Sequence, residues 1–213
     1  MMKLGSRLRT RLFTALLASQ FKEFGLGSRI VPPFTFSNLN QMRVGEGVLI
    51  QRDCWLTIPF GCGEEESVKI ILKSRVSVGK RTTITAARQV VIEEDVMLGA
   101  NCLISDHFHA FNDVGIPIAA QGIDNIKPIL IGRETWIGNN ASIQAGVTIG
   151  RHCVIGTNSV VTASIPDFSV AVGMPARVVK TLGPAPNGAE KVEALAAVRA
   201  SAPGASARPS ETR

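Results

Sequence analysis

An aliphatic residue recurs at every sixth position from Ile131 onward, and this period constrains the fold more than any other feature of the chain. The recurring residues are Ile131, Ile137, Ile143, Ile149, Ile155 and Val161. A period of six fits neither the stripe of an α-helix nor the alternation of an ordinary strand. It is typical of a parallel β-helix, in which each unit of six residues forms one short face of a triangular coil. Eighteen residues then complete a coil, so we expect Ile131 to stack against Ile149, Ile137 against Ile155 and Ile143 against Val161.

A small or β-branched residue follows four positions after each repeated isoleucine, where a tight corner is expected. These residues are Thr135, Ala141, Val147, Cys153 and Ser159. Upstream the same period runs in two registers displaced by two residues. One register holds Leu72, Val78, Ile84 and Val90, and the other holds Ile92, Leu98 and Ile104. We therefore predict an all-β fold with a β-helix over residues 28–183 and no second domain.

Composition narrows the class of partner. The chain has 213 residues, 45% of them apolar and only 5% aromatic, and it carries a net charge of +6. This charge suits anionic partners. It is scattered and does not alternate with aromatic residues as in a single-strand binder, so no nucleic acid is expected. Cys54, Cys62, Cys102 and Cys153 form no CxxC pair, which favours reduced, mostly buried thiols over a bridge between Cys54 and Cys62.

The two ends differ from the repeats. Residues 1–27 read as an amphipathic helical segment with its arginines around an apolar face. The segment 3–19 fits contact with an anionic membrane surface, and it fits packing on its own domain or on a neighbouring subunit equally well. Residues 184–213 are rich in Ala, Pro, Ser and Gly and are predicted to be a disordered tail that contains at most a short helix over 189–200.

The repeats stop between Ile104 and Ile131, so residues 105–130 are predicted to form an excursion from one coil. Glycines and prolines punctuate this segment. It contains Asp106, His107 and His109, which include two of the three histidines of the chain.

The segment WIGNNASIQAGVTIGRHCVIGTNSVVTASIPDFSVAVGMPARVVK, from Trp136 to Lys180, resembles hexapeptide-repeat O-acetyltransferases, the group of the galactoside and maltose acetyltransferases. The motif Asp106-His107-Phe108-His109 resembles the DHxH motif of sugar acetyltransferases in surface-polysaccharide pathways. The resemblance covers roughly residues 40 to 182. It implies a left-handed parallel β-helix, a homotrimer with active sites between subunits, a sugar or glycan acceptor, acetyl-CoA bound along the coils, and no metal.

Acetyl transfer to a hydroxyl requires a base, and histidine titrates in the right range. The resemblance assigns this role to His107, with His109 as the second candidate. Asp106 is expected to bind the acceptor or to tune the histidine. Neighbouring side chains on an extended segment point in opposite directions, so direct orientation of His107 by Asp106 is not expected.

The resemblance also places the substrate contacts. Ser77 and Thr85 occupy the positions of sugar contacts, where galactoside-type enzymes carry Asn and Asp. The positions that match CoA contacts are Asn139, Ala145, Thr157, Thr162, Arg177 and Lys180. Ala163 stands where the family often has a phosphate-binding Lys, a role that Arg151 could take over. Trp136 is expected to pack at a coil corner rather than to contact CoA.

Four alternatives stay open. A zinc-dependent carbonic anhydrase on the same scaffold would need His107, His109 and His152 to converge. A non-enzymatic β-helix scaffold would use the excursion only as a binding surface. A serine acetyltransferase would carry a long helical N-terminal domain, of which this sequence shows no pattern, and an N-acyltransferase for an amino nucleotide sugar would use the same base. The supply of acetyl-CoA indicates a cytoplasmic location, at the inner membrane if the acceptor is linked to a lipid.

Overall fold

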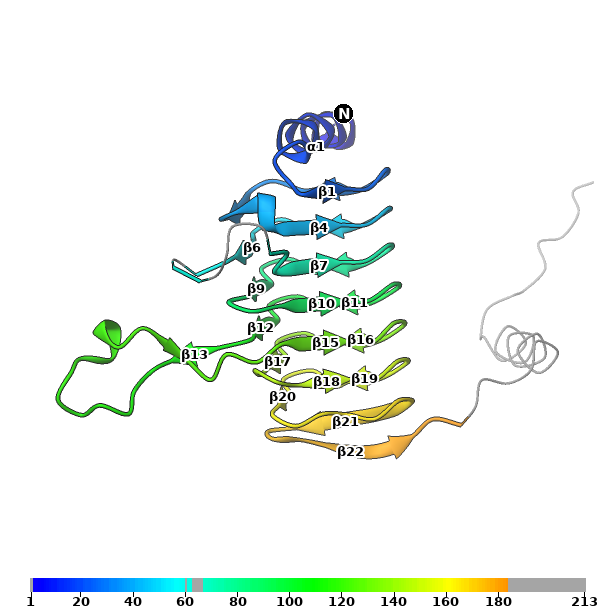
Figure 1. Ribbon diagram of the computed structural model, residues 1–213. Coiled ribbons are helices and arrows are strands. Elements are labelled where there is room, and N and C mark those ends of the chain that lie inside the picture. Colours follow the sequence, from blue (N-terminus) through cyan, green and yellow to red (C-terminus); the bar gives the residue numbers. More distant parts are fainter. Residues whose placement is uncertain (1, 60, 63–66, 184–213) are drawn as a thin grey trace, which may run out of the picture. The chain divides into compact units, whose positions relative to one another are not determined.

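The chain folds into a left-handed parallel β-helix whose coils stack from α1 to β22 (Figure 1). The computed structural model describes residues 2–59, 61–62 and 67–183, with side chains from residue 5 onward. The predicted tail, 184–213, lies outside the described residues. Within residues 2–182, each coil contributes one strand to each of three sheets, so the fold class predicted from the repeat is confirmed.

The three sheets form the three faces of the coil. Sheet A contains β1 (Glu23–Phe24), β4 (Met42–Val44), β7 (Ile70–Leu72), β10 (Val90–Ile92), β15 (Ile129–Ile131) and β18 (Thr148–Ile149). Sheet B contains β2 (Arg29–Ile30), β5 (Leu49–Ile50), β8 (Ser77–Val78), β11 (Met97–Leu98), β16 (Trp136–Ile137), β19 (Val154–Ile155), β21 (Ser169–Gly173) and β22 (Ala176–Thr181). Sheet C contains β3 (Phe34–Phe36), β6 (Cys54–Thr57), β9 (Thr83–Thr85), β12 (Leu103–Ser105), β17 (Ser142–Ile143) and β20 (Val160–Val161). A 3-10 turn, η1 (Leu39–Gln41), precedes β4.

The repeated aliphatic residues stack as the period predicts. Ile131 pairs with Ile149, Ile137 with Ile155, and Ile143 with Val161. All six of these side chains are 0% exposed. The interior is therefore a continuous aliphatic column whose burial grows with each added coil.

The displacement of two residues upstream has a structural cause. There the coils are twenty residues long, since Ile84 pairs with Ile104 and Val90 with Ile70. The additional residues lie between sheets C and A, where β9 and β10 are each one residue longer than β17 and β18. Ile92, and not Val90, therefore stacks on Leu72.

Small side chains fill the corners. Thr135, Ala141, Val147, Cys153 and Ser159 are each at most 1% exposed. The hydroxyl of Thr135 donates to the Gly150 carbonyl at 2.9 Å and accepts from the Cys153 N–H at 3.1 Å, which ties one coil to the next. All four cysteines are free thiols, and three of them are buried. Burial is the main cause that raises the pKa of Cys54 to about 11.

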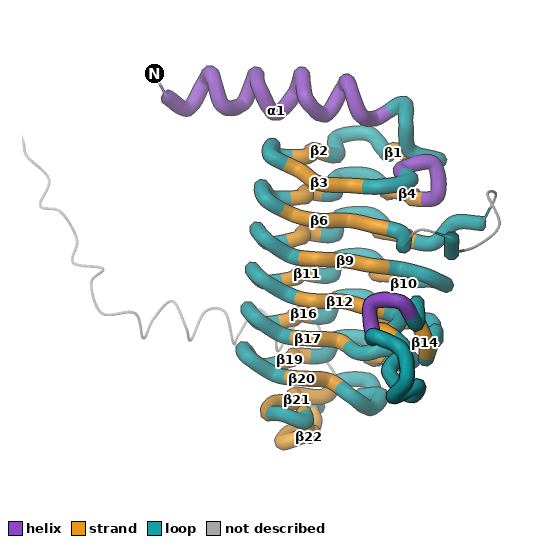
Figure 2. Tube along the Cα trace, turned by 90° about the vertical axis from the view of Figure 1, so that its left-hand side faces the viewer, coloured by secondary structure: helices purple, strands orange, loops and turns teal. Residues whose placement is uncertain are grey.

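Different elements close the two ends of the column. α1 (Met2–Ala18) lies across the first coil (Figures 1 and 2), where the Thr14 hydroxyl accepts the Ile30 N–H at 2.9 Å. At the other end β22 pairs antiparallel to β21. The first coil begins at β1, earlier than the boundary at residue 28, because β1 already pairs with β4 although its sequence carries no repeat. None of the helices in the described part of the chain is long and apolar enough to span a membrane.

The excursion leaves the column after β12 and returns at β15, so Ser105, Ile129 and Leu130 of the predicted range 105–130 belong to strands. It projects to the side of the coils (Figure 1). Its base is a short antiparallel hairpin of β13 (Phe108–His109) and β14 (Ile123–Asp124), and a 3-10 turn, η2 (Ile118–Ala120), lies between them. The Lys127 N–H donates to the Asp106 carbonyl at 2.9 Å and closes the excursion at its root.

The distance between coils generates a prediction about Gly132. A Cβ atom at this position would lie 2.6 Å from the carbonyl carbon of Gly150, so Gly132→Ala is expected to destabilise the fold by about 1–3 kcal/mol. Gly5 on α1 has nothing within 4 Å of its Cβ position, so Gly5→Ala should stabilise the fold by about 0.5–1 kcal/mol. Urea unfolding of both variants measures these opposite signs, and an unchanged midpoint for Gly132→Ala would contradict the close approach of the coils.

Candidate active site

The carboxylate of Asp106 is the centre of the candidate site, and it is fully buried. Its Oδ1 accepts the Ala87 N–H at 2.7 Å, and its Oδ2 accepts the N–H groups of Arg88 and Gln89 at 2.7 and 2.8 Å. These three donors belong to the corner of the preceding coil, between β9 and β10. Asp106 therefore holds the root of the excursion against that corner.

The same carboxylate contacts the neighbouring histidine. Nδ1 of His107 lies 2.8 Å from Oδ1 of Asp106, and the His107 side chain is 11% exposed. The expectation that the two side chains diverge is wrong, because Asp106 lies at a bend beyond β12 and not in an extended strand. The Ser105 hydroxyl donates to the His107 carbonyl at 2.7 Å and supports the bend. Asp106 is buried and contacts His107, which fits the second of its two expected roles, that of tuning the histidine.

The electrostatics of the pair determine which ring nitrogen is available. Burial on its own would raise the pKa of Asp106, but the hydrogen bonds from His107 and from the three backbone N–H groups outweigh it and lower the pKa. An ionised carboxylate accepts only, so the Nδ1–H of a neutral imidazole donates to it. Nε2 then carries the free lone pair, which is the arrangement that a general base requires.

The acceptor candidates lie on different faces of one chain. Thr85 pairs with Ser105 in sheet C, at the strand ends from which the excursion departs. Ser77 lies in sheet B, between Leu49 and Met97. His109 is exposed on β13, opposite Ile123 of the hairpin. A single chain thus brings Thr85 close to the root of the excursion but does not bring Ser77 to it.

The CoA candidates fall into three groups. Asn139 and Thr157 occupy equivalent corners of successive coils between sheets B and C. Ala145 and Thr162 follow β17 and β20, at the corners between sheets C and A. Arg177 and Lys180 are exposed on β22, opposite Val172 and Val170. The first two groups flank sheet C on its two sides, and the cationic pair lies on the last strand of sheet B.

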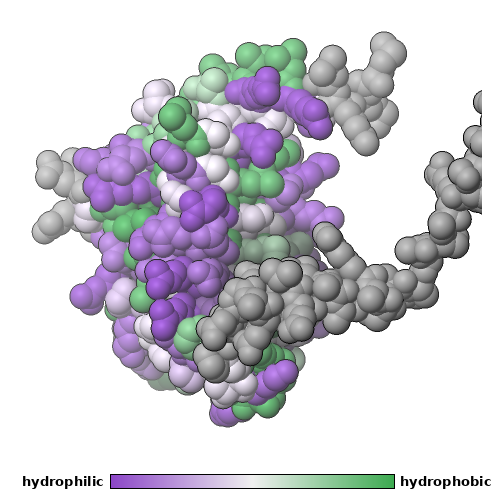
Figure 3. Space-filling view, turned by 90° about the vertical axis from the view of Figure 1, so that its right-hand side faces the viewer, coloured by the Kyte–Doolittle hydropathy of each residue, from purple (hydrophilic) through white to green (hydrophobic). Residues whose placement is uncertain are grey.

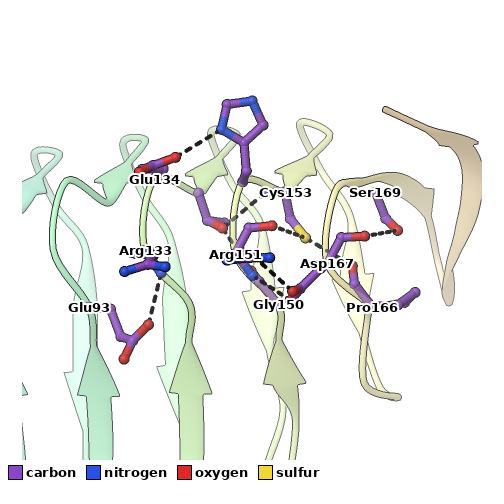
Figure 4. Close-up of polar contacts among 11 residues, drawn as sticks. Glu93, Arg133, Glu134, Gly150, Arg151, Cys153, Pro166, Asp167 and Ser169 are labelled. Atoms are coloured by element: carbon purple, nitrogen blue, oxygen red, sulfur yellow. Dashed lines mark hydrogen bonds and ion pairs between the residues drawn. The ribbon is translucent and has the colours of Figure 1, made fainter. Parts of the chain in front are cut away.

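The surroundings of two further residues bear on secondary expectations. Arg151 pairs with Asp167 at 3.1 Å (Figure 4). It also covers the Phe168 ring at 4.9 Å, and its role in place of the lysine that the family often has at the position of Ala163 stays a prediction. Trp136 is 47% exposed on the outer face of β16 between Met97 and Val154, so it is not a corner packing residue.

The three histidines do not converge. His152 lies between β18 and β19, at a corner between sheets A and B, and its Nδ1 is 3.2 Å from Oε2 of Glu134 (Figure 4). His107 follows β12, on an earlier coil and at a different corner. Within the residues that the structure describes, no three His, Cys, Asp or Glu side chains are grouped to hold a metal ion.

Sequence reasoning missed a polar ladder beside Asn139. Arg81 donates to Asn101 at 2.7 Å, Asn101 donates to Asn140 at 2.9 Å, and Asn140 donates to Asn158 at 2.9 Å. All four residues have a positive φ near 60°, a conformation that asparagine tolerates better than most residues. The signal that could have identified this ladder is the recurrence of Asn three positions after a buried aliphatic residue of sheet B, namely Leu98, Ile137 and Ile155.

Two parts of the repeat region match known families of hexapeptide repeats. Residues 128–163 match the family described as bacterial transferase hexapeptide (six repeats), and residues 89–118 match the hexapeptide repeat of succinyl-transferase. The chain therefore contains hexapeptide repeats of the kind found in bacterial transferases. It is 42% identical over 106 residues to the probable acetyltransferase Rv3034c of Mycobacterium tuberculosis, covering 50% of this chain and 35% of that protein. The chain therefore spans about a third of the length of this relative.

Two further likenesses extend over more of the chain. The galactoside O-acetyltransferase of Escherichia coli is 27% identical over 186 residues, which cover 85% of this chain and 90% of that protein. The solved structure of a mutant of AntD, an N-acyltransferase from Bacillus cereus, in complex with dTDP-4-amino-4,6-dideoxyglucose and coenzyme A, has a TM-score of 0.68 at 18% identity. It covers 88% of this chain and 96% of AntD, and at this identity it shows a shared fold.

The buried carboxylate generates a prediction about stability. Asp106→Asn leaves one oxygen and an amide NH2 facing four donors, so it should destabilise the fold by about 1–3 kcal/mol at neutral pH. Because folding lowers the pKa of Asp106, its contribution is complete above the ordinary value of 3.8 and is lost as the pH falls through the lower folded value. Urea unfolding against pH should show the difference between variant and wild type shrinking in acid.

Asp124→Asn is the matched control, since Asp124 is exposed on β14 and its carboxylate accepts the N–H of the next residue, Asn125, rather than donors from another coil. It should change stability little at any pH. Equal effects of the two substitutions would contradict a special role for the Asp106 carboxylate.

Proposed function

We propose that the chain is an acetyl-CoA-dependent O-acetyltransferase that transfers acetyl to a sugar hydroxyl in glycan biosynthesis, with His107 as the general base. The observation that carries the proposal is the contact between the buried Asp106 carboxylate and Nδ1 of His107. A carboxylate that holds an imidazole in one tautomer is the arrangement by which many enzymes activate a hydroxyl. The relatedness to acetyltransferases supports the acyl donor.

In the proposed reaction, Nε2 of His107 accepts the proton of the sugar hydroxyl while the hydroxyl oxygen bonds to the carbonyl carbon of the thioester. The imidazolium that forms is stabilised by Asp106, which stays ionised. The carbon–sulfur bond then breaks, and the proton passes from His107 to the departing thiolate. The products are an acetyl ester and CoA with a free thiol, so no oxidant, reductant or metal enters the balance.

The residues proposed to hold the donor fit its chemistry. Arg177 and Lys180 are exposed cations suited to the phosphates of the nucleotide. Thr157 and Thr162 are exposed hydroxyls at coil corners, and Ala145 is small enough for the pantetheine arm to approach the backbone. The amide of Asn139 accepts the Ala100 N–H at 2.8 Å, which orients this side chain between two coils.

We also propose a homotrimer in which the excursion of one chain covers the site of its neighbour. Several large apolar side chains on the excursion are exposed in the single chain, and such a surface is typical of an interface. They are Phe111 (62%), Val114 (103%), Ile116 (45%), Ile118 (55%) and Ile126 (39%). Assembly would also allow Ser77 of one chain to meet Thr85 and His107 of another, which the single chain keeps on separate sheets.

An amino nucleotide sugar is the alternative acceptor, because an amine needs the same base and AntD, which shares the fold, is an N-acyltransferase. A non-enzymatic scaffold is less favoured, because it gives the contact between the buried carboxylate and His107 no role. A serine acetyltransferase would use the same base and stays an alternative. The requirement for acetyl-CoA favours action in the cytoplasm.

His107→Ala is expected to lower acetyl transfer by about 10²-fold or more, the usual scale for loss of a positioned acid–base group. Binding of CoA, measured by calorimetry, and the mass of a trimer, measured by light scattering, should be unchanged. His152→Asn is the control, since His152 lies at another corner and Asn tolerates its positive φ of 52°. Unchanged turnover in His107→Ala eliminates it as the base, a large loss in His109→Ala alone transfers the role to His109, and a monomeric wild type overturns the trimer.

The acceptor class is tested by a screen of nucleotide sugars and lipid-linked glycans with acetyl-CoA, in which release of the free thiol is monitored. The product should lose its acetyl group on treatment with hydroxylamine, which cleaves esters under conditions that leave amides intact. A product that resists hydroxylamine would establish the N-acyl alternative. No thiol release with any acceptor, despite binding of CoA, would favour the scaffold.

A further inference from the structure

α1 presents an apolar stripe that no described part of the chain covers. Leu8, Leu12 and Leu16 lie one turn apart along the helix and are 59%, 59% and 73% exposed. With Gly5, Arg9 and Phe13 they line a shallow apolar groove of about 400 Å³. The hydrophobic side chains of this region lie along the top of the molecule in Figure 3, next to hydrophilic ones.

The stripe faces away from the coils because the opposite face of the helix is anchored. Leu17 is 7% exposed in the core, and Thr14 is buried against the first coil. The Thr14 hydroxyl accepts the Ile30 N–H at 2.9 Å, which satisfies a donor at the open end of sheet B. At 100° per residue, Leu12 lies on the side of the helix opposite to Thr14 and Leu17. The helix is therefore fixed with its apolar stripe directed outward, past the end of the coils.

Arg9 and Arg11 flank this stripe, and Arg7 lies nearer the coils. Arg7, Arg9 and Arg11 belong to α1, which contains no acidic residue. Together with Arg29 of β2 they line a hollow of about 530 Å³ beneath the helix. Within the described residues, none of these four arginines takes part in an ion pair.

We infer that this face docks on an anionic phospholipid surface, with the three leucines in the acyl boundary and the arginines on the phosphate groups. A helix with an apolar stripe flanked by cations is the usual element that lies in the plane of such a surface, and unpaired arginines match its negative charge. A second copy of the chain is disfavoured as the occupant, because it would bring two clusters of unpaired arginines together. The inference does not depend on acyl transfer.

Vesicle flotation with the full-length chain tests this inference. Wild type should float with vesicles of equimolar phosphatidylcholine and phosphatidylglycerol and should not float with phosphatidylcholine alone. L8S/L12S/L16S, which alters only exposed side chains, should lower the bound fraction by roughly tenfold or more. R7Q/R9Q/R11Q should also lower it, and added salt should weaken wild-type binding because it screens the charges.

R52Q/K80Q/R133Q is the matched control, since it removes the same net charge from exposed positions on the coils and should float like wild type. Failure of wild type to float with the anionic vesicles overturns the inference. So does flotation of L8S/L12S/L16S at the wild-type level, which would make the binding purely electrostatic. A fall in oligomeric mass of L8S/L12S/L16S without vesicles, measured by light scattering, would assign the stripe to a second copy and would overturn it as well.

Discussion

The close stacking of successive coils is the constraint on which the rest of this structure depends. The parallel strands of the coils each bond to the strand one coil away, and the interior residues of adjacent coils meet in a continuous aliphatic column. Backbones approach so closely at the corners that Gly132 has no room for a Cβ atom beside Gly150. Side chains can extend outward only along the faces and at the corners, so polar chemistry must be placed there.

Asp106 shows how the column supports an irregular segment. The excursion interrupts the repeat. At its root, the carboxylate of Asp106 accepts hydrogen bonds from three backbone N–H groups of the previous coil. This anchor places His107 at the edge of a rigid face, although the remainder of the excursion is largely exposed. An imidazole held in this way keeps one tautomer and one direction, which a general base requires and which loops seldom provide by themselves.

The candidate residues are distributed over two of the three sheets, so one chain does not bring all of them together. His107, Thr85 and Ser105 gather at one end of sheet C, whereas Ser77 and the cations of β22 belong to sheet B. Exposed apolar residues on the excursion provide a reason for chains to associate. The excursion and the candidate residues lie along the sides of the column. The cationic surface with an apolar stripe lies at its end, on α1.

The hexapeptide period by itself determined the β-helix, the pairs that stack in the interior and the small residues at the corners, because a regular repeat leaves one arrangement that buries every aliphatic residue. It also located the excursion to within two residues, whereas His107 was proposed from the resemblance of Asp106-His107-Phe108-His109 to a family motif. Only the tertiary structure decided that Asp106 orients His107, since the donors that bury its carboxylate come from Ala87, Arg88 and Gln89, far away in sequence. The positions of Trp136 and Arg151, and the coils of twenty residues upstream, likewise depended on contacts between coils that a period within one coil does not specify.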